Sequence, residues 1–126
     1  MIGGRVLDAS AVVGFASGAS VYAAALVWTA VEEGLVLAVP ATSAAAAWSL
    51  LRDKHHPVLE VLLRLPATVI DELTASRARA VGGVGGDLAD AHAVLCARDR
   101  GWPLVTGDAV RYAGMDLSGV EIEPLP

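Results

Sequence analysis

Short apolar runs alternate with longer segments of helical periodicity along this chain of 126 residues. Four runs have the length and the Gly or Pro boundaries of buried strands, and they cover residues 5–7, 35–39, 68–70 and 104–106, with a fifth candidate at 120–122. The intervening segments predict helices over residues 9–16, 19–33, 41–52, 55–65 and 74–81 and from 87 to about 100. Repeated strand–helix alternation predicts a single domain over residues 1–126, an α/β/α three-layer sandwich around a parallel sheet of four to five strands.

Local signals mark several of the helix ends. Gly34 and Gly101 follow apolar helical segments in the C-cap role, and Asp87 precedes another helix as its N-cap. The glycine-rich run over residues 82–86 is predicted to be a flexible hinge that closes the preceding helix. It is not a phosphate-binding loop, because it lacks the preceding strand and the Lys-Ser/Thr pair that such a loop requires.

Composition fits this architecture and limits the function. The hydrophobic fraction is 55%, largely Ala, Val and Leu, as expected for a sheet covered by helices on both faces. Cys96 is the only cysteine, so no intrachain disulfide can form, and we expect a cytoplasmic location. The net charge of -5 argues against an extended basic surface for nucleic acids. Two local basic patches remain candidates: Arg52, Lys54, His55 and His56, or Arg98, Arg100 and Arg111.

A membrane-spanning interpretation also has to be considered. The stretch between Asp8 and Glu32 carries no charge and is long enough to cross a bilayer, and it contains a small-residue pair at Gly14 and Gly18. However, residues 17–20 have the pattern of a turn followed by a helix start, and a second uncharged run is broken by Pro40. We therefore favour a buried α/β core.

Three aspartates stand where an acidic metal site would need them. Asp8 follows the first strand, Asp108 follows the fourth, and Asp90 lies in the helix before the fourth strand. In open parallel sheets, ligands bind at the carboxyl ends of strands near the point where strand order reverses. Clustered carboxylates favour a hard cation such as Mg²⁺ or Mn²⁺, which points to metal-assisted phosphodiester chemistry. Taken alone, Asp8 is better explained as the cap of the helix that begins at Ala9, and Asp108 as the cap of the short turn before Tyr112. Only the joint pattern with Asp90 favours a metal site.

The order and spacing of these segments resemble a PIN domain, most closely the small single-domain toxins of the VapC class. The resemblance covers essentially the whole chain. It is carried by Val6-Leu7-Asp8-Ala9-Ser10, by Leu37-Ala38-Val39-Pro40, and by the segment from Asp90 through Trp102-Pro103-Leu104-Val105-Thr106-Gly107-Asp108. It implies a Mg²⁺- or Mn²⁺-dependent endoribonuclease that a cognate antitoxin neutralises. It also implies that Asp8, Asp90 and Asp108 are acidic ligands and catalytic residues, supported by the hydroxyls of Ser10 and Thr106.

One position departs from the family pattern. The resemblance places a second acid, usually Glu, where this chain has Ala46. Asp87 is a candidate replacement ligand, because i,i+3 spacing puts it beside Asp90 on one helix face. Three interpretations of the alanine stay open: a site that works with fewer acids, a weakened or inactive relative, or an inactivating substitution. Two functions follow, an active toxin ribonuclease or a degenerate PIN domain that acts as a binding or regulatory module.

The remaining conspicuous residues are expected to have structural roles. His92 is nearly opposite Asp90 around its helix, and Trp48 and Trp102 are expected in the core or at a dimer interface. The second helix is more apolar than one sheet face requires, and this predicts a homodimer. The residues that form the expected interface are Val21, Tyr22, Ala25, Val27, Trp28 and Val31.

Overall fold

The computed structural model describes residues 3–126 and contains one five-stranded parallel sheet. The strands are β1 (Gly4–Leu7), β2 (Val36–Pro40), β3 (Thr68–Asp71), β4 (Leu104–Thr106) and β5 (Ile122–Pro124), in the order β3-β2-β1-β4-β5. The chain builds outward from β1 to β2 and β3, and then returns to the other side of β1 with β4 and β5. Strand order therefore reverses between β1 and β4, where their carboxyl ends form a natural crevice.

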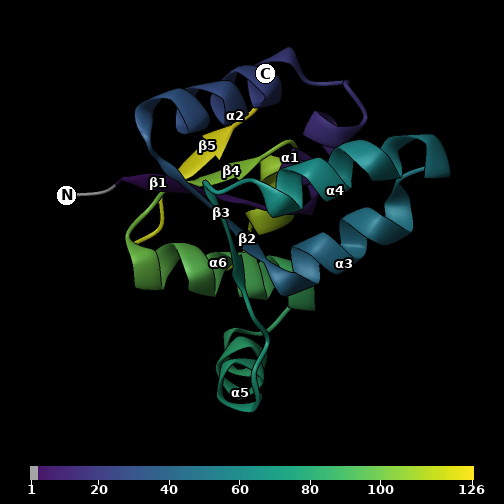
Figure 1. Cartoon of the computed structure of the whole chain (residues 1–126). Helices are drawn as coiled ribbons and strands as arrows, with labels where there is room; N and C mark the ends of the chain where they lie inside the picture. The colour runs from purple at the N-terminus through teal and green to yellow at the C-terminus, as the bar shows by residue number, and fades with distance from the viewer. Residues whose placement is uncertain (1–2) are drawn as a thin grey trace.

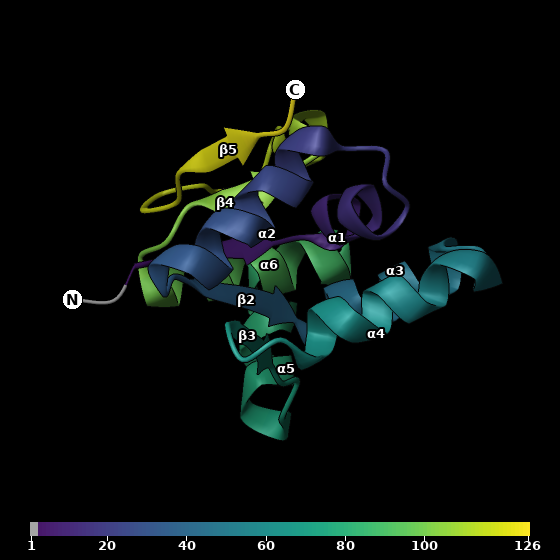
Figure 2. The same cartoon turned by 45° about the horizontal axis from the view of Figure 1, so that its top comes forward.

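Within residues 3–126, six helices accompany the sheet (Figure 1): α1 (Ala9–Ala16), α2 (Val21–Glu33), α3 (Ala41–Leu50), α4 (His56–Arg64), α5 (Ala75–Val84) and α6 (Leu88–Arg100). Helices α1, α2 and α4 cover one face, and α6 covers the other (Figures 1 and 2). Helix α3 packs against both α1 and α6. Two short 3-10 helices, η1 (Asp53–His55) and η2 (Ala109–Tyr112), complete the fold. The predicted α/β/α sandwich is confirmed.

Side-chain alternation along the strands divides the core into two layers. Leu7 and Val105 pack with the helices of the first face, whereas Val6 and Leu104 pack with α6 on the second. Burial on both faces explains why these four neighbouring positions of β1 and β4 are all apolar. Trp48 and Trp102 pack at the edges of the two layers, as expected.

The predicted helix ends are confirmed where a capping residue marks them. Asp87 accepts a hydrogen bond from the Asp90 amide, and Gly34 and Gly101 end their helices in the left-handed conformation. The predicted glycine hinge is wrong at its start, because α5 continues through Gly82 and Gly83 to Val84. The positive φ angles fall on Gly85 and Gly86 instead, so only these two glycines form the turn.

The long uncharged segment between Asp8 and Glu32 forms two helices, α1 and α2, in the structure. Among the helices of residues 3–126, none is by itself long and apolar enough to cross a membrane. Helices α1 and α2 pass that test only when they are taken together, and a bend of 94° separates them.

Candidate functional site

A cavity of about 390 Å³ lies at the carboxyl edge of the sheet, beside the point where strand order reverses. Asp8, Asp90 and Asp108 all line it, together with Asp87 and Arg111. The structure therefore brings together the four acids that the sequence singled out. The rest of the wall comes from α1, the α1–α2 turn, α3 and α6: Ala9, Ser10, Val13, Gly14, Ser17, Ala19, Ala46, Leu50 and Ala89.

Asp8 is fixed in place at the base of this site. It is only 3% exposed. Its Oδ1 accepts hydrogen bonds from the Ser10 hydroxyl at 2.7 Å and the Ala11 amide at 2.9 Å. Its Oδ2 accepts one from the Tyr112 hydroxyl at 2.6 Å. The predicted capping role of Asp8 is thus confirmed, and the same carboxylate also faces the cavity.

Tyr112 acts on Asp8 as a permanent donor. Burial of the Tyr112 hydroxyl, together with the negative charge of Asp8, raises the pKa of this phenol far above its usual range. The phenol therefore keeps its proton near neutral pH and cannot serve as a base. Because Tyr112 is 1% exposed, it also anchors η2 to the core beneath the cavity.

Two hydroxyls connect the ends of β1 and β4. Ser10 Oγ lies 3.1 Å from Thr106 Oγ1 and accepts a hydrogen bond from the Gly107 amide at 2.8 Å. Thr106 Oγ1 in turn accepts one from the Asp108 amide at 3.0 Å. This network holds the loop that carries Asp108 against the loop that carries Asp8. Asp108 occupies the N-cap position of η2, as the capping interpretation predicts, but its exposed side chain makes no capping hydrogen bond.

Asp90 is paired with an arginine that the sequence analysis had placed only in a basic patch. Arg111 Nε lies 3.2 Å from both oxygens of Asp90, and Arg111 Nη2 lies 3.1 Å from Oδ2. The same Nη2 lies 3.7 Å from Asp87. Burial raises the pKa of Asp90, and the charges of Asp87 and Asp8 add to this effect although Arg111 opposes it. Four carboxylates and one guanidinium line the cavity, so carboxylates outnumber basic side chains there even with Arg111.

Ala46 lies on α3 in the wall of the same cavity and is half-buried. The Ala46 side chain therefore faces the same cavity as the four acids and adds no carboxylate to it. Within residues 3–126, no three His, Cys, Asp or Glu side chains are grouped so that they could hold a metal ion.

His92 does not belong to the cavity. It is fully buried, with Nδ1 2.9 Å from the Thr42 hydroxyl and Nε2 3.2 Å from Asp71. Asp71 also accepts two hydrogen bonds from Arg77, at 2.7 and 3.2 Å. The predicted structural role of His92 is thereby supported. Asp71, the acid that contacts His92, is not evident from the sequence. Its position at the end of β3 is similar to that of Asp8 directly after β1, and this similarity is the one signal that could have indicated it.

The arginines of the predicted patch Arg98, Arg100 and Arg111 make separate contacts in the structure. Arg98 donates to the backbone carbonyls of Asp116 and Ser118, and Arg100 lies over the Trp102 ring at 5.5 Å. Arg111 alone among these arginines lines the acidic cavity.

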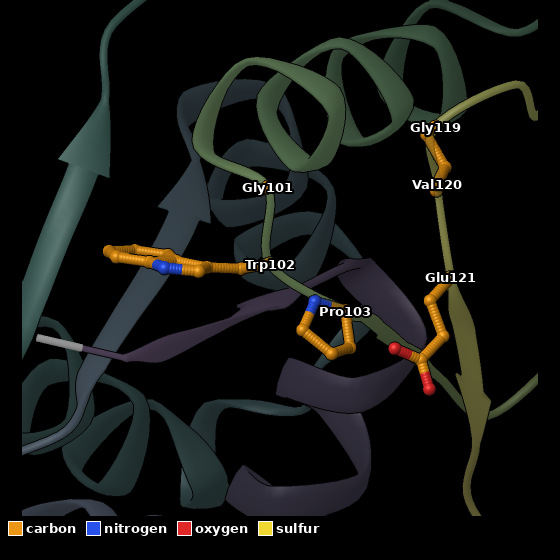
Figure 3. Close-up of a pocket in the computed structure, with 6 residues that line it drawn as sticks. All are labelled: Gly101, Trp102, Pro103, Gly119, Val120 and Glu121. Carbon is orange, nitrogen blue, oxygen red and sulfur yellow. The ribbon is translucent and has the colours of Figure 1, made fainter. Parts of the chain in front are cut away.

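A second hollow, of about 380 Å³, lies at the opposite edge of the sheet, before β4 and β5 (Figure 3). Glu121 is the one ionisable side chain among its described lining residues, and it lies on the other side of Pro103 from Trp102. This hollow is at the amino ends of the strands and lacks convergent polar groups, so it is not the candidate site.

Comparisons with known proteins identify the fold. No family model matches the sequence, and no curated protein matches it. Among solved structures, the chain is similar to one in the crystal structure of VapBC2 from Rickettsia felis bound to a DNA fragment from their promoter. The TM-score is 0.69 over 100% of both chains, at 14% sequence identity. At this identity the similarity shows a shared fold, which confirms the predicted PIN-like α/β architecture.

Proposed function

We propose that this chain is a Mg²⁺- or Mn²⁺-dependent endoribonuclease of the PIN-domain toxin type, neutralised by an antitoxin protein. The main support is the convergence of Asp8, Asp90 and Asp108 on one cavity at the carboxyl edge of the sheet. The fold similarity to a chain of a VapBC2 structure supports the toxin type and the antitoxin partner.

No three acidic side chains of the described residues are grouped as a metal site, but a hard divalent cation needs only one or two carboxylates, and four line the cavity. Mg²⁺ is usually held by one or two carboxylates, while waters and substrate phosphates complete its coordination. Asp8 and the exposed Asp108 would hold the ion, and Asp90 and Asp87 are the further carboxylates within the cavity. When bound, such an ion lowers the pKa of a water molecule and offsets charge on the phosphate.

The chain's own residues supply positioning. Three hydrogen bonds hold both oxygens of Asp8, so this carboxylate does not need to reorient when a ligand arrives. The hydroxyls of Ser10 and Thr106 fix the Asp108 loop relative to Asp8. Among the described acids of the site, Asp108 is the exposed carboxylate that follows a strand, and it would be the first to meet an approaching phosphate or the cation that accompanies it.

A second candidate function is a degenerate PIN domain that binds a partner without cleaving RNA. Two observations favour it: Ala46 supplies no carboxylate to the cavity wall, and Arg111 already pairs with Asp90. Losing one positioned acid–base group typically costs about two to four orders of magnitude in rate.

We further propose that the protein forms a homodimer through α2. Val21 and Trp28 are 83% and 69% exposed, and Tyr22, Ala25 and Val31 are exposed beside them. The expected contribution of Val27 is wrong, because Val27 is 6% exposed and packs into the core. Neighbouring exposed apolar side chains of this kind commonly mark interfaces.

The decisive experiment measures cleavage of a fluorophore-labelled single-stranded RNA by the purified chain, with Mn²⁺ or with EDTA. We expect cleavage in Mn²⁺ only, and a loss of at least about 100-fold in Asp8→Asn and Asp108→Asn. Glu72→Gln is the matched control, since Glu72 is an exposed acid outside the cavity. Mn²⁺ binding without cleavage would favour the degenerate domain, and equal activity in all variants would refute the site.

A further inference from the structure

We propose that Arg111 determines the concentration of divalent cation that the site requires, because its guanidinium contacts both carboxylate oxygens of Asp90 and would have to move away before a cation could bind there. This inference rests on the proposed function. It adds a residue that neither the resemblance nor the acidic pattern indicated, and it assigns that residue a competitive role.

The contact itself resembles the coordination of a cation. Both oxygens of Asp90 face the guanidinium, at 3.2 Å from Nε and 3.1 Å from Nη2, and Asp87 lies 3.7 Å away on the same helix. Charge-assisted contacts of this kind use the lone pairs that a metal ion would need. The guanidinium and a cation therefore compete for the carboxylate of Asp90.

The two partners differ in their freedom to move. The Asp90 side chain is 11% exposed, whereas the Arg111 side chain is 45% exposed at the rim of the cavity. Next to Arg111, Tyr112 is buried and hydrogen-bonded to Asp8, so the backbone of η2 is anchored. The arginine side chain can turn toward solvent without any change in the fold, while Asp90 stays in place.

Charge balance indicates the direction of the effect. Four carboxylates line the cavity, and Arg111 is the one basic side chain among its described lining residues. Removing Arg111 leaves the carboxylates without a counter-charge and frees both oxygens of Asp90. A divalent cation should then bind more tightly, and the cation-free protein should be less stable because like charges are left uncompensated.

The test is Mn²⁺ binding by isothermal titration and thermal melting with and without Mn²⁺, for wild type, Arg111→Gln and Arg111→Lys. We expect Mn²⁺ affinity to rise about tenfold in Arg111→Gln, the equivalent of one partly buried ion pair. The cation-free variant should melt below wild type, and saturating Mn²⁺ should remove that difference. Arg79→Gln is the matched control, because it removes an exposed arginine outside the cavity and should leave Mn²⁺ affinity within about twofold.

Arg111→Lys distinguishes the direct contact of Arg111 with Asp90 from the effect of a positive charge at position 111. Lysine keeps the positive charge but cannot reproduce the forked contact with both oxygens. Competition for Asp90 predicts a Mn²⁺ affinity between those of wild type and Arg111→Gln. Equal Mn²⁺ affinities in wild type and Arg111→Gln would overturn this inference and leave the proposed function standing. If none of the proteins binds Mn²⁺, both are refuted.

Discussion

Replacing Ala46 with glutamate directly tests whether the cavity is a metal site that lacks one acid. Ala46 is half-buried in the cavity wall, in a helix that packs against both α1 and α6. A glutamate there adds a carboxylate to the cavity that Asp8 and Asp90 also line. Helix α3 tolerates the change, because glutamate has nearly the helix propensity of alanine.

The magnitude follows from the charges already present. Four carboxylates and one guanidinium line the cavity, so the new charge enters a negative field. Two unit charges about 8 Å apart interact by ~2 kcal/mol at an effective dielectric constant near 20, and solvent in the open cavity reduces this to ~1 kcal/mol. Without metal, Ala46→Glu should therefore lower the melting temperature by roughly 3–5 °C. With Mn²⁺, an added oxygen ligand should raise affinity at least tenfold.

The assay combines Mn²⁺ titration calorimetry with thermal melts of the cation-free protein, followed by RNA cleavage. Ala45→Glu is the matched control, because Ala45 is exposed on the same helix and does not line the cavity. A lower melting temperature together with tighter Mn²⁺ binding, in Ala46→Glu alone, would support the metal site. If Ala46→Glu and Ala45→Glu behave alike in both measurements, the assignment of Ala46 to the acidic position is wrong.

Three further predictions concern the rest of the molecule. Arg77→Gln should cost about 2 kcal/mol in urea denaturation, because it removes the permanently charged partner of the nearly buried Asp71 and leaves His92 in contact with it. Burial raises the pKa of Asp71, but hydrogen bonds led by that of Arg77 outweigh it, so the net pKa falls below 3.8. This contribution to stability is present above pH ~4 and is lost as pH falls through the lower folded-state pKa; Asp71→Asn should remove that acid dependence in urea melts. Trp28→Glu should convert the proposed dimer to a monomer in light scattering; a wild-type monomer at micromolar concentration would refute the dimer.

Local chemistry made much of the fold predictable from the sequence. Helix α1 has the predicted boundaries, because Asp8 caps its start and Ser17 ends it. The boundaries of β5 were predicted two residues too early, since pairing with β4 selects Ile122–Pro124. Strand order is likewise set by contacts between distant segments, which a local apolar pattern does not encode.

The sequence could predict those residues of the candidate site whose positions depend only on the order of strands and helices. Asp8 and Asp108 follow adjacent parallel strands, so their convergence is a consequence of the fold. The Arg111–Asp90 contact was not predictable, because it depends on one side-chain conformation across 21 positions of sequence. The same holds for the contact between His92 and Asp71, where the acid is recognisable only once β3 and α6 are placed together.

Ala46 and Arg111 change the cavity in the same electrostatic direction. An alanine at the proposed acidic position removes one negative charge, and an arginine beside Asp90 adds one positive charge. Both reduce the excess of carboxylates that would otherwise destabilise the protein without a cation. The same two features weaken the attraction for a divalent ion, so the stability of the cation-free protein and its affinity for metal should be inversely related at this site. The active and the degenerate interpretations then differ in one quantity, the affinity of the cavity for a divalent cation. The Mn²⁺ concentration at which a cation replaces Arg111 at Asp90 measures that affinity and decides between them.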